Sequence, residues 1–150
     1  RDARIAMIYE GTNGIQALDL VGRKLPAHMG RYLRSFFHPV SQFIEANKEH
    51  ETFGKMIEGL EKAFGALQLS TAATEYTRLL GLVAMGYCFA KAALLAQAKL
   101  AEGSEETAFY KAKITTSRFY FDRILPQATA AFLAIKSGKA SMMDLEADAF

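Results

Sequence analysis

Cysteine is nearly absent from this sequence. Cys88 is the only cysteine in 150 residues, which excludes an internal disulfide framework and fits a reducing compartment. It lies within an apolar run and has no histidine close to it in the sequence. We therefore expect a thiol buried in the core and not a catalytic nucleophile.

Patterns typical of metal and nucleotide sites are also missing. His28, His38 and His50 are ten and twelve residues apart and belong to no HExxH pattern or cysteine pair, so we expect satisfied or solvated histidines and no bound metal. The glycines at 11 and 14 form neither a Walker loop nor a GxGxxG after a strand. The net charge of +2 is too small to indicate a nucleic-acid partner.

Two residue clusters have ordinary explanations. We expect the basic cluster to be a solvated face, with contact to a phosphate as the alternative. The aromatic residues fall at helical spacing, so we expect core positions and not base-stacking platforms. The basic cluster is Arg23, Lys24, Arg31 and Arg34, and the aromatic group is Phe36, Phe37, Phe119, Tyr120 and Phe121.

Strand-like alternation persists nowhere, and apolar residues instead recur at intervals of three and four. One such stripe is Met56, Leu60, Phe64 and Leu67, and a second runs from Tyr110 to Ile135. With 51% hydrophobic residues, a packed core needs no covalent staple. The sequence therefore predicts an all-α fold, an antiparallel helical bundle of about four long helices preceded by a short helical entry segment.

Polar residues, glycine and proline divide the chain into helices. Asn13 and Gln16 make a plausible capping box at the first helix, Pro39 is expected to kink or break the second, and Pro126 to bend the last. We expect residues 139–150 to be a loosely held tail. The predicted helices run from about Gly14 to Pro26 and over about 27–46, 51–68, 71–101 and 105–137.

Residues 79–96 form an apolar run that approaches the length of a membrane span. The run contains Lys91, two glycines and many alanines, and it lacks an aromatic belt with basic flanks. We therefore expect a buried helix of a bundle and no membrane span.

The stretch Ile8-Tyr-Glu-Gly-Thr-Asn-Gly-Ile15 places a carboxylate at a turn between apolar residues. Such surroundings disfavour the charged form of Glu10 and raise its pKa toward neutrality, as a general base requires. Thr12 to Gly14 begin the next predicted helix, and the free N–H groups of a helix start suit a phosphate. The alternative is an ordinary glutamate beside a turn.

These residues carry a resemblance. Arg1-Asp-Ala-Arg-Ile5, Ile8-Tyr-Glu-Gly-Thr-Asn-Gly-Ile-Gln16 and Leu20-Val-Gly-Arg-Lys24 resemble the end of the C-terminal helical domain of acyl-CoA dehydrogenases. The resemblance implies that Glu10 is the catalytic base, that Gly11 lies against the substrate, and that Thr12, Asn13 and Gly14 touch FAD. Many members have glutamine where Gly14 stands, so only a backbone contact is implied there.

Residues 27–150 resemble, more weakly, the extra C-terminal helical domain of longer members such as the 3-methylmercaptopropionyl-CoA dehydrogenase-like enzymes. We therefore expect two parts, 1–25 as the end of the dehydrogenase C-terminal helical domain and 27–150 as the C-terminal-like bundle. Because the chain begins with Arg1 inside an apparent helix, we expect a fragment that is inactive alone.

The resemblance also implies the setting of the complete protein. It implies an acyl-CoA substrate, an electron-transfer flavoprotein or similar acceptor, a homo-oligomer, no nucleic-acid partner, and a bacterial cytoplasmic location. The alternative function from the sequence is a non-enzymatic helical module for oligomerisation or interaction, in which the Glu10 region is a vestige.

Overall fold

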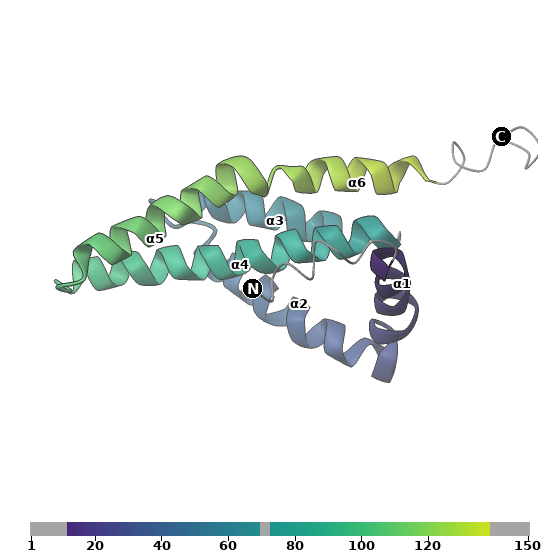
Figure 1. Ribbon diagram of the computed structural model, residues 1–150. Coiled ribbons are helices and arrows are strands. Elements are labelled where there is room, and N and C mark those ends of the chain that lie inside the picture. Colours follow the sequence, from purple (N-terminus) through teal and green to yellow (C-terminus); the bar gives the residue numbers. More distant parts are fainter. Residues whose placement is uncertain (1–11, 70–72, 139–150) are drawn as a thin grey trace, which may run out of the picture.

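The computed structural model describes residues 12–69 and 73–138. Within these ranges the regular elements are all helical (Figure 1), which confirms the predicted all-α class. The elements are α1 (Thr12–Asp19), η2 (Leu20–Lys24), α2 (Ala27–Asn47), α3 (Gly54–Gln68), α4 (Ala73–Ala101), α5 (Thr107–Phe119), η3 (Tyr120–Ile124) and α6 (Gln127–Ser137).

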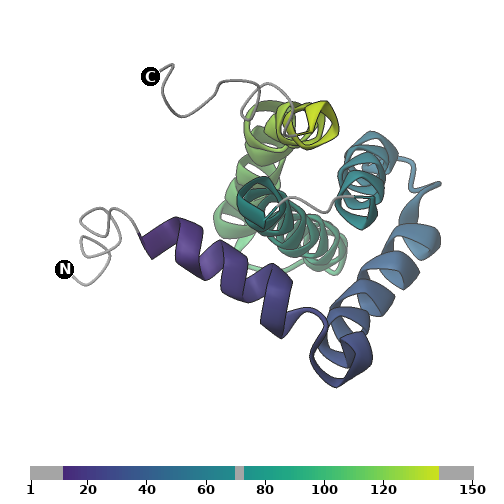
Figure 2. The ribbon, with the colours of Figure 1, turned by 90° about the vertical axis from the view of Figure 1, so that its right-hand side faces the viewer.

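The long helix α4 is the axis on which the other helices pack. It contacts α1, α3, α5 and α6, and Figure 2 shows these helices arranged around it. One face of α4 is buried at intervals of three and four residues, including Tyr76, Leu79, Val83 and Ala90. This spacing is that of a single buried helix face.

The composition of α4 would also suit a membrane span. Glu75–Ala101 is long and apolar enough to cross a bilayer, with a mean hydropathy of 1.9 and 33% of its most apolar window buried. One such helix is weak evidence for a membrane span, because the core helix of a soluble protein passes the same test. The contacts of α4 with four other helices account for its apolar inner face.

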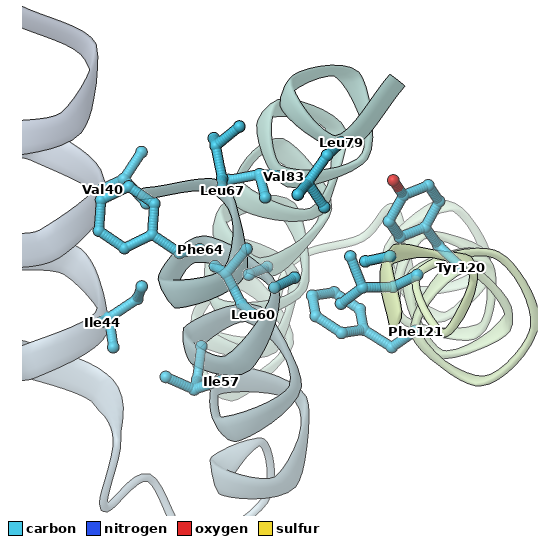
Figure 3. Packing of buried hydrophobic residues seen from close by; sticks show 14 of the residues in the cluster. Val40, Ile44, Ile57, Leu60, Phe64, Leu67, Leu79, Val83, Tyr120 and Phe121 are labelled. Carbon is cyan, nitrogen blue, oxygen red and sulfur yellow. The ribbon is translucent and has the colours of Figure 1, made fainter. Parts of the chain in front are cut away.

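The core lies where α2, α3, α4 and η3 meet. Figure 3 shows their side chains gathered around Leu60 of α3. Leu60, Phe64 and Leu67 are buried as predicted, and so are Phe121 and Leu125 of the second predicted stripe. A Cβ at Gly86 of α4 would lie 3.2 Å from Leu60 Cδ1, so the absence of a side chain there allows α3 and α4 to approach closely.

Two π-helical turns precede prolines in the same way. The Leu25 N–H donates to Leu20 O (2.8 Å) before Pro26, and the Leu125 N–H donates to Tyr120 O (2.9 Å) before Pro126. A proline ring clashes with the carbonyl four residues earlier, and the wider turn relieves that clash. The bend expected at Pro126 is present, since α5 and α6 meet at an angle in Figure 1.

The helix α2 continues through Pro39, so the predicted break does not occur there, and a kink at Pro39 stays a prediction. Non-helical backbone angles inside α2 instead occur at His28, Met29 and Gly30, with φ of 51°, 55° and 74°. Pro39 lies on the exposed side of α2, where a carbonyl that loses its N–H partner can bond to water. The chain therefore changes direction through a left-handed turn next to Pro26.

The start of α3 was also predicted too early, at about residue 51, because the loop after α2 extends to Phe53. His50 Nδ1 accepts hydrogen bonds from the N–H groups of Thr52 (3.2 Å) and Phe53 (3.3 Å), and the Gly54 N–H donates to His50 O (2.7 Å). These bonds hold a turn over the residues that were expected to be helical.

Candidate functional site

The predicted site residues fall on both sides of the first described position. Glu10 and Gly11 lie outside the described residues. Thr12, Asn13 and Gly14 form the first turn of α1, and all three are exposed. Asn13 lies inside α1 and is therefore not the N-cap that the sequence predicted, because the helix already includes Thr12, the first residue that the structure describes.

Packing against α4 fixes the position of this first turn. Ala17 is the one buried residue of α1, and it lies on the helix about one turn after the three exposed residues. Its methyl group allows α1 to lie close against α4. The exposed residues Thr12, Asn13 and Gly14 are therefore carried by a helix that is held in place.

Among the described residues, the space beside Gly14 is open. Apart from the backbone of α1 itself and the neighbouring residues in the chain, no heavy atom of this part of the chain lies within 4 Å of the position that a Cβ would take at Gly14. The first N–H groups of a helix have no partner within the helix and favour an anion. An exposed turn with an open glycine can therefore bind a negatively charged group through its backbone.

The C-terminal end of α1 has its own electrostatics. The Arg23 guanidinium donates to both carboxylate oxygens of Asp19, at 3.0 Å for Nη2 to Oδ2, and Lys24 Nζ lies 3.2 Å from Oδ2. The hydrogen bond from Arg23 lowers the pKa of Asp19 to about 2, with Lys24 acting in the same direction. Asp19 carries one negative charge and pairs with two cations, Arg23 and Lys24. The three side chains together therefore keep a net positive charge.

The predicted basic cluster borders a groove that the sequence did not indicate. Arg23, Lys24, Arg31 and Arg34 are exposed, as expected of a solvated face. The groove lies between η2, α2 and α4 and has a volume of about 450 Å³, within the range of small-molecule pockets. Its lining residues are Leu20, Lys24, Leu25, Tyr32, Leu33, Phe36, Leu80 and Ala84.

Two predictions about buried residues are wrong. Cys88 and Phe119 were expected in the core, and both are exposed. Cys88 lies with Met85 in a small depression of about 210 Å³ between α4 and α5. The helices are apolar on more than one side, so the neighbouring helices decide which side is buried. Of the other aromatic residues, Tyr120 and Phe121 are buried, and Phe36 and Phe37 are partly buried against the core.

Two of the three histidines have structural contacts. His50 Nδ1 accepts hydrogen bonds from two backbone N–H groups, and its ring stacks on Phe53. The rings of His28 and Tyr32 form a T-shaped pair. Within 12–69 and 73–138, no three His, Cys, Asp or Glu side chains are grouped so that they could hold a metal ion.

Comparisons with known proteins agree with the family resemblance. Residues 68–146 match the family described as acetyl-CoA dehydrogenase C-terminal like. A butyryl-CoA dehydrogenase of Syntrophomonas wolfei is 31% identical, and the match covers 100% of this chain and 28% of the relative. A 3-methylmercaptopropionyl-CoA dehydrogenase of Ruegeria pomeroyi is 33% identical over 87% of this chain and 25% of its own length.

A more distant relative extends the same pattern. The broad-specificity linear acyl-CoA dehydrogenase FadE5 of Mycobacterium tuberculosis is 26% identical over 100% of this chain and 28% of its own length. The chain thus spans about a quarter of the length of the curated relatives that it matches. The family match covers more than half of the chain, and this chain belongs to the acyl-CoA dehydrogenase family.

Proposed function

We propose that this chain is the C-terminal part of an FAD-dependent acyl-CoA dehydrogenase that converts an acyl-CoA thioester to a trans-2-enoyl-CoA. One observation supports the proposal above all others. A chain of this enzyme family carries Tyr9-Glu-Gly-Thr-Asn-Gly14, and the last three of these residues form the exposed first turn of a helix anchored on α4.

Glu10 is the proposed general base. The α-proton of a thioester is only weakly acidic, so its removal at neutral pH requires a positioned base with a raised pKa and a donor to the developing enolate oxygen. We propose that the Glu10 carboxylate takes this proton and that its own backbone N–H donates to the thioester carbonyl. Gly11 follows Glu10 and has no side chain, so it leaves space for the substrate.

Thr12, Asn13 and Gly14 fit the proposed contact with FAD. They are exposed residues in the first described turn of α1, with open space beside Gly14 among the described residues, and the free N–H groups of a helix start suit a phosphate or another acceptor group. When bound, FAD supplies the acceptor for the hydride that leaves the β-carbon of the substrate. In this proposal the chain contacts FAD through one helix end only. The other contacts with FAD must then come from the rest of the complete protein.

This division of the site has a consequence for the chain by itself. We propose that the 150-residue chain neither retains FAD nor catalyses the reaction, because one helix turn provides too few contacts to hold a dinucleotide. We further propose that the complete protein is a homo-oligomer that passes its electrons to an electron-transfer flavoprotein or similar acceptor. Purified chain with flavin near one-to-one would contradict the first of these statements.

The decisive experiment is Glu10→Gln in the polypeptide encoded by the complete reading frame. The substitution keeps the size of the side chain and removes the base, so we expect reduction of the flavin by acyl-CoA to fall by at least the ~10²–10⁴-fold typical of general bases. Flavin content and acyl-CoA binding should persist. Flavin that bleaches at a rate near that of the unsubstituted protein would show that Glu10 is not the base. A complete protein without flavin would favour the interaction module.

A further inference from the structure

The segment from α1 to the first half of α2 has an unusually apolar exterior. Ile15 and Leu18 of α1 and Met29 and Tyr32 of α2 are all exposed, with 66% of Leu18 and 88% of Met29 accessible. We call residues 12–36 the basic limb. Exposed apolar side chains that cluster on one segment indicate a surface that binds a protein, a membrane or a ligand.

The groove between η2, α2 and α4 belongs to the same surface. Seven of its eight lining residues are carbon-rich side chains, and Lys24 is the one cation. Figures 1 and 2 show α1 crossing the N-terminal end of α4 and the chain then turning into α2. The basic limb therefore presents an apolar depression flanked by exposed apolar residues.

The charge of the limb restricts what can cover it. Residues 12–36 contain four cations, Arg23, Lys24, Arg31 and Arg34, and a single carboxylate, Asp19. Asp19 is already bonded to Arg23 and Lys24, and among the described residues Arg31 and Arg34 have no ion pair. In a dimer formed through this face, the cations of one copy would lie against the cations of the other, and such like-charge contacts are unfavourable. The complementary surface is apolar and has acidic residues at its rim.

We infer that the basic limb binds an apolar, acid-rimmed surface on the dehydrogenase part of the same polypeptide, the part that the relatives possess and this chain does not span. The chain corresponds to 25–28% of the length of three relatives, so such a polypeptide has ample surface to offer. This inference rests on the proposed function, but its test does not depend on catalysis.

Cysteine labelling can locate the covered surface. We would compare Leu18→Cys and Leu33→Cys on the basic limb with Leu95→Cys on α4, all in a Cys88→Ser background. Leu95 is a matched control, because it is 59% exposed and lies on α4 more than two turns beyond Ala84, the last groove residue of that helix. Each variant is made in the 150-residue chain and in the complete polypeptide, and its reaction with a soluble maleimide is timed.

We expect Leu18→Cys and Leu95→Cys to react at similar rates in the 150-residue chain. In the complete polypeptide, Leu18→Cys and Leu33→Cys should slow by at least about tenfold, because reaction then requires a local opening, and Leu95→Cys should be unchanged. Arg31→Glu with Arg34→Glu should restore labelling of Leu18→Cys, and Lys111→Glu with Arg118→Glu on α5 should not.

Other results would overturn the inference. Equal labelling of limb and control in the complete polypeptide would show that the limb is uncovered. Protection that appears only as protein concentration rises would assign the surface to a second copy. The labelling needs no turnover, so Glu10→Gln leaves it unchanged. A protein that is protected at the limb but does not bleach its flavin would contradict the proposed function alone.

Discussion

Helix α3 and the α1–η2 segment are of similar length and opposite character. Five residues of α3 are buried, whereas Ala17 is the one buried residue of α1 and η2 has none. α3 packs against α2, α4 and α6, while α1 contacts mainly α4. Both segments carry apolar residues at helical spacing. The difference shows that an apolar stripe becomes a core only where several neighbouring elements surround it.

The largest expected effect on the free energy of unfolding distinguishes α3 from the α1–η2 segment. Leu60 is fully buried among α3, α4 and η3, so Leu60→Ala should reduce the free energy of unfolding by about 2–5 kcal/mol. Leu18→Ala on the exposed face of α1 should change it by no more than about 0.5 kcal/mol. Urea denaturation of the 150-residue chain measures both. Equal losses would mean that α1 is as well packed as α3.

A second pair of variants tests how closely the helices of the bundle approach. Gly86→Ala places a methyl group 3.2 Å from Leu60 Cδ1 and should destabilise by about 1–3 kcal/mol. Gly81 on the same helix has open space around its Cβ position, so Gly81→Ala should stabilise by up to about 1 kcal/mol. A stabilising Gly86→Ala would show that α3 and α4 are loosely packed.

Tyr120 tests the polar contact within the same core. Its hydroxyl donates to Leu82 O at 2.8 Å, and Tyr120→Phe should cost about 0.5–1.5 kcal/mol at neutral pH. Burial raises the pKa of Tyr120 to about 12, from an ordinary value of 10.0. The unfolded chain therefore loses this proton first, and stability that is complete below pH 10 should fall as the pH rises toward 12.

Denaturation between pH 8 and pH 12 checks this slope. Tyr120→Phe should reduce the dependence of stability on pH without abolishing it, because burial also raises the pKa of Tyr76. A slope that is the same in the variant would mean that Tyr120 is accessible to hydroxide in the folded state.

The smallest effect concerns the left-handed turn of the limb. Met29 has φ of 55° and is 88% exposed, so its backbone is strained while its side chain buries little surface. Met29→Gly should stabilise the chain by no more than about 1 kcal/mol. Met29→Ala keeps the unfavourable φ and should be neutral. If both variants are neutral, the turn adopts ordinary helical angles in solution.

Local patterns in the sequence were enough to predict most of the helices, and the proposed catalytic motif was also identified from the sequence. The stripe of Leu60, Phe64 and Leu67 predicted a buried face because helical periodicity is local, and Pro126 predicted the bend before α6. The sequence also predicted a helix near Gly14, and α1 includes Thr12 to Gly14. Glu10 and Gly11 stay predictions, since they lie outside the described residues.

Only the tertiary structure decided which sides of the apolar helices are covered. α4 is apolar around much of its circumference, and the positions of α3 and α5, not its own composition, left Cys88 exposed. The non-helical backbone angles in α2 occur at His28–Gly30 and not at Pro39, although proline is the residue that a local pattern marks as a helix breaker. The groove beside Lys24 joins residues from three elements, and no local pattern specifies how distant segments meet.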